Sequence, residues 1–458
     1  MWLGPLEWAP MARRPPLPPG PFLIVGLARS GRAVARALRA RGERVVGCDA
    51  GAVDGAARDE LERAGVAVHE STGGPALLDG VATVVKSPGV PQDAPVVQAA
   101  RARGLPVVGE LELGWRLVPN DVIAITGSNG KTTTTELVGQ IHRAAGVPVA
   151  VAGNVGTALS TLAGALEPDA VVVCEASSFQ LEDSVAFAPD AAVLLNLAPD
   201  HLDRHGTFAA YREAKLRIFA NQGSPELAVV PAGLDVPGAA RRVTFASPLG
   251  QAAGDEAAGR ADLILRDDRL AWRGEPLIAV DQIRLRGAHN VENAMAAAAV
   301  ALARGIDAGA VRTALATFAG VAHRLEEVGT VDGVVYVDDS KATNVASAVV
   351  GIRSFAGGVH AILGGRGKRE DYAPLAAALA ERAAAAYLIG EEAERLRAAL
   401  GPTGVPLHDC GDLERAVAAA RAAAVPGETV LLSPACASYD QYRSFEQRGD
   451  HFKALVRG

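Results

Sequence analysis

The chain has 458 residues, 49% of them hydrophobic, which excludes a generally disordered protein. At about 150 residues per domain this length predicts roughly three domains. With 45 basic and 52 acidic side chains the formal net charge is −7, which argues against a dedicated nucleic-acid-binding protein. The four cysteines form no CxxC pair and no run of 18 apolar residues occurs, so we expect a cytoplasmic protein without disulfides, a zinc knuckle or a membrane span.

The N-terminal part of the chain begins with a proline-rich stretch, residues 1–20, which lacks the apolar region of a signal peptide and is predicted to be a loose tail. Residues 21–25 then predict a buried strand, followed by a turn with Gly26 and Gly31, a helix, and a second strand that ends at Asp49. This order is typical of a nucleotide-binding βαβ unit. The glycines do not fit G-x-G-x-x-G, however, so an ordinary tight turn of a doubly wound sheet is the alternative.

A further strand of this unit, over residues 81–86, leads into a turn that contains Ser87 and Gly89. Open α/β sheets bind ligands at the carboxyl ends of their strands, so both residues are candidate nucleotide contacts. We assign residues 21–109 to a first domain.

A second predicted domain, residues 110–320, contains the strongest motif of the chain. A strand over 121–125 leads into TGSNGKTT, and a helix continues to about residue 145. Glycines let backbone N–H groups wrap phosphate oxygens, and the helix N-terminus adds the positive end of its dipole. Lys131 would reach the β- and γ-phosphates of a nucleotide, and the Thr132 hydroxyl would ligate Mg²⁺. The loop is shorter than the full phosphate-loop pattern, and the alternative is a chance turn. The candidate phosphate-binding residues are Gly127, Ser128, Asn129, Gly130, Lys131, Thr132 and Thr133.

Polar residues also follow two further predicted strands of this domain. Glu175 ends one strand and is placed like the metal-binding carboxylate of a Walker-B motif; the alternative is a solvated acid beside a helix cap at Ser177. His201 follows the next strand and is a candidate metal ligand, with a structural histidine as the alternative. By itself Lys215 indicates only a cation on a helix surface. These two strands are predicted over 170–174 and 191–195. A further strand is predicted over 227–230, and helices over 290–304 and 308–318.

In the third predicted domain, residues 321–458, strands and helices alternate, which predicts a parallel sheet with covered faces. Strands are predicted over 334–337, 359–363, 385–389 and 430–432, and helices over 344–354 and 372–382. Three polar loops, 337–344, 364–368 and 433–438, follow predicted strands. Each could be a solvated loop, but three of them at neighbouring strand ends favour a ligand site.

Five motifs together resemble the Mur ligases: TGSNGKTT, EASSFQLE, NLAPDHLDRHG with YREAK, DDSKATN, and LSPACASYDQYRSFEQRGDHF. The resemblance extends from about residue 21 to the C-terminus. The phosphate loop is shared by the whole superfamily, including folylpolyglutamate synthetases, whereas DDSKATN and the last motif are characteristic of the branch that adds D-glutamate.

The resemblance implies a three-domain α/β protein: a Rossmann-like N-terminal domain for the UDP moiety, a central P-loop ATPase domain with a mostly parallel sheet, and a Rossmann-like C-terminal domain for the amino acid. It implies an ATP-dependent ligase of peptidoglycan precursor synthesis. In the implied reaction, ATP would phosphorylate the carboxylate of UDP-N-acetylmuramoyl-L-alanine, and the amine of D-glutamate would then displace phosphate from the acyl phosphate. We expect a monomer with no nucleic-acid or membrane partner.

The same resemblance implies roles for individual residues. The implied catalytic residues are Lys131, His201 and Lys215, and the implied ligands of two Mg²⁺ ions are Thr132, Glu175, His201 and a Lys215 carbamylated by CO₂. The implied ATP contacts beyond the loop are Asn293, Arg324 and Asp339. The implied substrate contacts are Ser87, Gly89, Asn154, Thr343, Lys368, Ser438 and the Phe445 backbone. One departure is that Ala50 and Gly51 follow Asp49 where the family often has a hydroxyl and a cation, so no uridine contact is predicted there.

Two alternatives stay open at this point. A sibling ligase could add L-glutamate to the same acceptor, because stereochemistry depends on small displacements around Lys368 and Ser438. A nicotinamide-binding oxidoreductase or a regulatory nucleotide-binding module could also account for the N-terminal βαβ unit, although the imperfect glycine pattern and the phosphate loop count against both.

Overall fold

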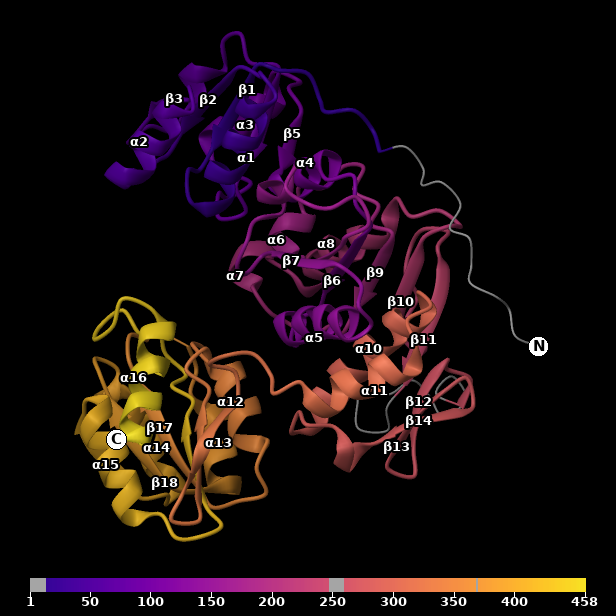
Figure 1. Cartoon of the computed structure of the whole chain (residues 1–458). Coiled ribbons are helices and arrows are strands. Elements are labelled where there is room, and N and C mark those ends of the chain that lie inside the picture. The colour runs from indigo at the N-terminus through magenta and orange to yellow at the C-terminus, as the bar shows by residue number, and fades with distance from the viewer. Residues whose placement is uncertain (1–13, 247–258, 368–369) are drawn as a thin grey trace. The chain divides into compact units, whose positions relative to one another are not determined.

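The structure, a computed structural model, describes residues 14–246, 259–367 and 370–458 (Figure 1). In these residues the strands form three sheets. Two compact units result: one extends to Arg284 and includes His289–Phe318, and the other comprises Leu285–Ala288 and Ala319–Gly458. The first unit contains two sheets and the second contains one. The predicted α/β class with mostly parallel sheets is confirmed, while the domain boundaries near residues 110 and 321 stay predictions.

The N-terminal sheet has five parallel strands in the order β3-β2-β1-β4-β5. Alternate residues of β1 point to opposite faces: Phe22 and Ile24 join one hydrophobic cluster, and Leu23 joins the other. Both faces are therefore covered, as the uninterrupted apolar run predicts. The strand order reverses between β1 and β4, so the turns that follow these strands border a crevice. The strands are β1 (Phe22–Val25), β2 (Val45–Cys48), β3 (Ala67–His69), β4 (Thr83–Lys86) and β5 (Val107–Gly109), and the helices are α1 (Arg29–Ala40), α2 (Gly55–Arg63) and α3 (Pro95–Ala102).

The central sheet has the order β14-β13-β12-β11-β10-β9-β6-β8-β7. Its strands pair in parallel from β7 to β12, and β13 is antiparallel to both of its neighbours. Its strands are β6 (Val122–Thr126), β7 (Val149–Gly153), β8 (Val171–Glu175), β9 (Ala191–Leu194), β10 (Leu227–Pro231), β11 (Arg241–Ala246), β12 (Leu263–Arg266), β13 (Arg269–Trp272) and β14 (Glu275–Ala279). The helices are α4 (Glu110–Leu117), α5 (Lys131–Ala144), α6 (Ser178–Leu181), α7 (Leu202–His205), α8 (Phe208–Ala220), α10 (Ala288–Ala303) and α11 (Ala308–Thr317). Strand β6 lies between β8 and β9, so the turns after these three strands meet at one sheet edge.

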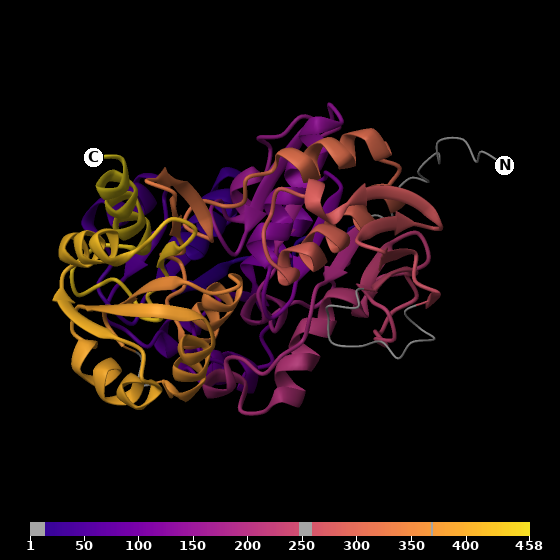
Figure 2. The ribbon, with the colours of Figure 1, turned by 90° about the horizontal axis from the view of Figure 1, so that it is seen from below.

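The C-terminal sheet has the order β15-β16-β20-β17-β18-β19, and only β15 is antiparallel to its neighbour. Helices cover both of its faces (Figure 2). The strands are β15 (Glu326–Val331), β16 (Val334–Asp338), β17 (Val359–Gly364), β18 (Ala383–Ile389), β19 (Leu407–Gly411) and β20 (Thr429–Leu432). The helices are α12 (Val345–Arg353), α13 (Ala373–Arg382), α14 (Ala393–Leu400), α15 (Leu413–Ala423) and α16 (Phe445–Arg457).

The N-terminal tail differs from the prediction in the part that the structure describes. The Arg14 guanidinium donates to the main-chain oxygens of Trp115 at 2.8 Å and Asn120 at 2.6 Å, so the chain is not loose there. Further along, Thr83 donates to the Pro19 oxygen at 2.8 Å. The loose tail was predicted from the proline-rich composition and the lack of a continuous apolar region. These residues are instead held through side-chain donors and main-chain oxygens.

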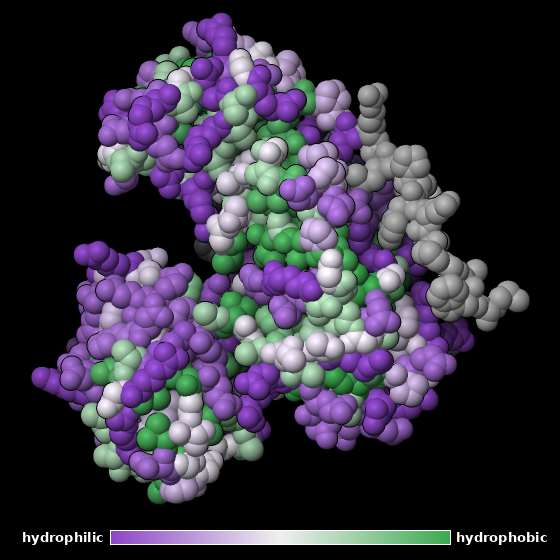
Figure 3. Space-filling view, viewed as in Figure 1, coloured by the Kyte–Doolittle hydropathy of each residue, from purple (hydrophilic) through white to green (hydrophobic). Residues whose placement is uncertain are grey.

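One face of the molecule shows both polar and apolar residues (Figure 3). Hydrophilic residues predominate over the faces of the N-terminal and C-terminal domains that Figure 3 shows. Within the described ranges, no helix combines the length and the apolar character needed to cross a bilayer.

Candidate functional site

The turn between β6 and α5 is shaped by close contact with α10. Gly130 has a φ of 82°, and a Cβ atom there would lie 2.1 Å from Oδ1 of Asn293. Glycine is thus the residue that both the left-handed backbone and the close approach allow. The fold brings the predicted Asn293 against the predicted phosphate loop.

Two lysines converge on the same turn. The Lys131 ammonium donates to the main-chain oxygens of Gly127 at 2.9 Å and Ser128 at 3.0 Å. Lys215 of α8 also donates to the Gly127 oxygen, at 2.7 Å, and is only 1% exposed. Burial, and secondarily the charge of Lys131, lowers the pKa of Lys215 to about 6. Lys215 is therefore a buried amine that is largely neutral at pH 7, rather than a surface cation.

Two residues that the sequence reasoning did not single out hold the turn in place. The Tyr211 hydroxyl donates to Ser128 Oγ at 2.9 Å. The Asn196 side-chain oxygen accepts from the backbone N–H of Asn129, also at 2.9 Å. Both residues lie in motifs that were identified because of neighbouring residues. The sequence therefore shows their polar groups but not the residues to which they bond.

Glu175, at the end of β8, is 3% exposed, so the alternative of a solvated acid is wrong. Its Oε1 accepts a hydrogen bond from the Asn154 side-chain amide at 3.1 Å. The main-chain oxygen of Asn154 in turn accepts from the Arg29 guanidinium at 2.7 Å. Ser177 does cap α6, as that alternative expected. A buried carboxylate and the Thr132 hydroxyl supply the oxygen ligands that Mg²⁺ prefers, so the residues fit such an ion.

His201 lies apart from this group in its contacts. Its side chain is 48% exposed, and its Nε2 lies 3.5 Å from Oδ2 of Asp200. Its ring centroid lies 4.8 Å from that of Phe179, and its φ is 50°. The role of His201 as a metal ligand stays a prediction.

A cavity of about 620 Å³ opens where the N-terminal strand order reverses. The predicted Ser87, Gly89 and Asn154 line it together with Arg29 and Gln180, two residues that the sequence reasoning missed. Arg29 follows the glycine-rich turn and Gln180 stands in EASSFQLE, so each was close to a recognised signal. The Asp49 carboxylate also lines this cavity and accepts from the Leu27 backbone N–H at 2.8 Å.

In the C-terminal unit the DDSKATN loop is joined to the other two polar loops. Asp339 is buried and accepts from the Ser433 hydroxyl at 2.7 Å, and burial raises the pKa of Asp339 to about 7. The Arg324 charge opposes that shift. The main chain of Arg366 pairs with that of Ala437, which connects the second loop to the third.

The buried Arg448 holds the C-terminal strand ends together. Its guanidinium donates to Ser340 Oγ at 3.0 Å and to the Cys436 oxygen at 3.2 Å, and Ser340 donates to the oxygen of the predicted Phe445 at 2.8 Å. The predicted Thr343 lies in the same loop as Ser340, and the predicted Ser438 is buried. Lys368 lies outside the described residues.

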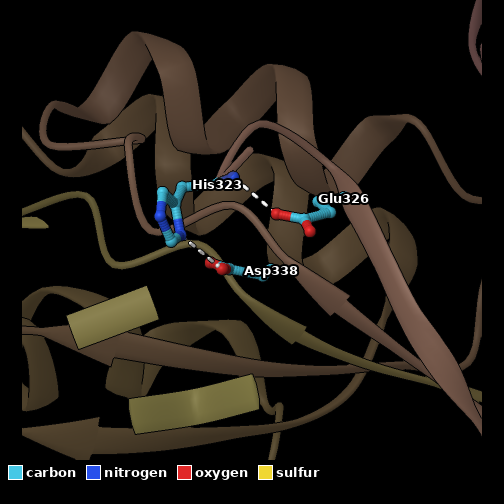
Figure 4. Close-up of side chains that lie close together, drawn as sticks. All are labelled: His323, Glu326 and Asp338. Carbon is cyan, nitrogen blue, oxygen red and sulfur yellow. Dashed lines mark hydrogen bonds and ion pairs between the residues drawn. The ribbon is translucent and has the colours of Figure 1, made fainter. Parts of the chain in front are cut away.

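A cluster of His323, Glu326 and Asp338 lies beside these loops (Figure 4). His323 Nδ1 is 2.7 Å from Asp338 Oδ2, and its backbone N–H donates to Glu326 Oε2 at 2.8 Å. The Lys453 ammonium lies 2.6 Å from Glu326 Oε2 and 3.8 Å from Asp338 Oδ2. A protein cation therefore already balances these carboxylates, and we read the cluster as an ion network.

Comparison with known proteins agrees with this arrangement. The family model described as "Mur ligase MurD-like, N-terminal domain" matches residues 21–109, "Mur ligase middle domain" matches 125–301, and "Mur ligase, glutamate ligase domain" matches 323–436. The chain is 45% identical to a protein named UDP-N-acetylmuramoylalanine–D-glutamate ligase from Myxococcus xanthus, over 95% of this chain and 97% of that protein. A protein of the same name from Acidobacterium capsulatum is 42% identical over 95% of both chains.

Solved structures share the fold. UDP-N-acetylmuramate-alanine ligase MurC from Thermotoga maritima has a TM-score of 0.59 at 19% identity, covering 95% of this chain and 99% of that one. MurF ligase from the same organism, in complex with ADP, has a TM-score of 0.58 at 17% identity, covering 90% and 95%. The predicted resemblance and three-domain fold are confirmed: the chain belongs to the Mur ligase family.

Proposed function

We propose that this protein uses ATP to join D-glutamate to UDP-N-acetylmuramoyl-L-alanine in peptidoglycan synthesis. The observation that carries the proposal is the convergence of Lys131 and Lys215 on the Gly127 oxygen of the phosphate loop. A carboxylate is a poor acyl donor, and transfer of a phosphoryl group to it supplies a leaving group. Such transfer depends mostly on positioning and charge neutralisation, and the Lys131 ammonium at this loop can neutralise charge on the phosphoryl oxygens. Family membership and the names of the relatives support the same activity.

ATP and Mg²⁺ are the proposed cofactors. Thr132, Glu175, His201 and a carbamate on Lys215 would hold two ions, whose charge would offset that of the phosphoryl oxygens. The buried amine of Lys215 would form an N–C bond to CO₂ and release a proton, which turns a lysine into a carboxylate-like oxygen ligand. Lys131 would neutralise the transferred group, and Asn293 would contact the nucleotide at the loop.

Substrate contacts are proposed from the family resemblance and from the residues that line the cavity. The cavity lined by Ser87, Gly89 and Asn154 would take the UDP-linked acceptor. Arg324 and Asp339 remain predicted ATP contacts, and the predicted D-glutamate contacts are Thr343, Lys368, Ser438 and the Phe445 backbone. We propose a cytoplasmic monomer without nucleic-acid or membrane partners.

Phosphate release tests the reaction directly. We expect release only when ATP, UDP-N-acetylmuramoyl-L-alanine and D-glutamate are present together, because the acyl phosphate needs the amine to turn over. Omission of each substrate in turn is the control. Release with L-alanine or meso-diaminopimelate but not with D-glutamate would contradict the substrate assignment, and a parallel assay with L-glutamate separates the enantiomers.

The fit between Gly130 and Asn293 yields a second expectation. Gly130→Ala should weaken ATP binding by at least about tenfold, since a Cβ atom would displace Asn293. Gly146→Ala, just beyond the other end of α5, is the matched control, because Gly146 also has a positive φ of 72° but nothing within 4 Å of its added Cβ. Both should lose about 1 kcal/mol of stability from the left-handed backbone. Calorimetric titration with a non-hydrolysable ATP analogue measures the difference, and equal affinities in the two variants would contradict the expectation.

A further inference from the structure

A buried ion pair joins the N-terminal and central parts of the first unit. Lys86, the last residue of β4, has a side chain that is 0% exposed, and its ammonium lies 2.8 Å from Oδ2 of Asp183, which is 2% exposed. Burial lowers the pKa of Lys86 and raises that of Asp183, while the attraction between the two charges opposes both shifts. Two apolar side chains would fill this space at a lower desolvation cost.

The pair is bonded to the segment that follows β4. The Lys86 ammonium donates to the Val90 oxygen at 2.8 Å, and Asp183 Oδ1 accepts from the Gln92 side-chain amide at 2.8 Å. Residues 87–91 form one wall of the 620 Å³ cavity. Lys86 thus bonds Val90 within this wall, and Asp183 bonds Gln92 directly after it. Asp183 itself lies just after α6, a helix of the central domain.

A second charged donor reaches the same wall. The Arg204 guanidinium donates to the Val90 oxygen at 2.9 Å and lies 3.3 Å from Oε2 of Glu182. One main-chain oxygen therefore receives bonds from two cations, and hydrogen bonds from charged donors are stronger than neutral ones. Four charged groups surround the Val90 oxygen: the cations Lys86 and Arg204 and the carboxylates Asp183 and Glu182. Their charges cancel, so this network needs no ligand for charge balance.

We propose that Lys86 and Asp183 are positioning residues that fix the 87–91 wall of the cavity in the conformation that binds the UDP moiety of the acceptor. The proposal rests on the proposed function in that it takes the cavity's ligand to be the UDP-linked substrate. Because the pair contacts the wall and not the phosphate loop, it controls the KM for the acceptor. It leaves kcat at saturating acceptor and the KM for ATP unchanged, the pattern of lost uniform binding.

The test compares two variants of the full chain. Lys86→Met leaves the Asp183 charge buried without its partner, so its melting temperature should fall. Lys86→Met combined with Asp183→Leu removes both charges, so its melting temperature should recover. Val90 still loses its bond from Lys86 and Gln92 its bond to Asp183, however, and the KM for the acceptor should stay about tenfold above that of the wild type. Asp79→Asn is the matched control, because it breaks an exposed ion pair with Arg103 in the same domain.

Calorimetric titration with UDP, without ATP or D-glutamate, gives a readout that does not depend on turnover. Weaker UDP binding by the double variant at a recovered melting temperature supports the proposal. Wild-type UDP affinity and acceptor KM in that variant, or equal increases in the KM of all three substrates, overturn it. A wild-type enzyme that binds no UDP and releases no phosphate refutes the proposed function itself, whatever the variants do.

If the double variant does not fold, Gln92→Leu decides the question. It removes the hydrogen bond to Asp183 Oδ1 and the one that Gln92 Oε1 accepts from the exposed Arg101 guanidinium, and it leaves the ion pair in place. An acceptor KM raised several-fold at unchanged kcat supports the positioning role, and an unchanged acceptor KM overturns it.

Discussion

Lys131→Ala is expected to lower kcat for phosphate release by at least about a thousandfold. The Lys131 ammonium stands at the N-terminus of α5 and is held by two loop oxygens, so it presents a fixed positive charge to a bound phosphate. The backbone N–H groups of the loop remain in the variant, but they carry only partial charges. Two hydrogen bonds of about 1 kcal/mol each are lost from a half-buried side chain, so the melting temperature should fall by only a few degrees.

The control for Lys131→Ala lies on the same helix. Arg143→Ala removes a cation from the last turn of α5, where its side chain is 48% exposed and lies 3.9 Å from Glu136. The kcat of this variant should equal that of the wild type, because Arg143 lies at the far end of α5 from the phosphate loop. A Lys131→Ala rate within about tenfold of the wild type, equivalent to about 1.4 kcal/mol, would reject the role of this lysine.

Lys215→Ala is expected to be inactive and to regain part of its rate when acetate or formate is added. The variant loses the bond to the Gly127 oxygen and leaves a buried space beside the phosphate loop. A short carboxylic acid in that space would restore the oxygen ligand that a carbamate provides. The measurement is kcat as a function of acid concentration at constant ionic strength.

Lys215→Arg separates the carbamate from a simple requirement for charge. Arginine places a permanent cation at this position and fills the space, so neither the rate nor a response to acetate should return. A mass increase of one CO₂ on Lys215 in the wild type would support the same role independently. Absence of rescue in Lys215→Ala would count against the carbamate, and an active Lys215→Ala would exclude Lys215 as a catalytic group.

The local elements of the fold could be predicted well because their signals are contiguous. The strand, glycine turn and helix around Lys131 are specified within about 25 residues by apolar runs, glycine and helix periodicity. Strands β11 to β14, on one side of the central sheet, were not predicted, since they are partly exposed. Their pairing depends on neighbours elsewhere in the chain rather than on a strong pattern of their own.

The partners of individual side chains could not be predicted from the sequence. Arg14 lies in a proline-rich stretch whose composition predicted a loose tail, yet its acceptors are main-chain oxygens about a hundred residues away. Arg448 was quoted only as part of FEQRG, and its burial among three loop ends depends on how the C-terminal sheet closes. A sequence shows which donors and acceptors exist but not how they pair across the fold.

The amino-acid sequence by itself determined the family, the three α/β domains and the phosphate loop, because each depends on residues that are neighbours in the chain. Only the tertiary structure decided that Lys215 is buried against Gly127, that Asn293 lies on Gly130, and that Lys86 meets Asp183. The physical reason is that desolvation and charge pairing depend on which residues surround a group in space. Sheet order sets those surroundings, and chain spacing does not.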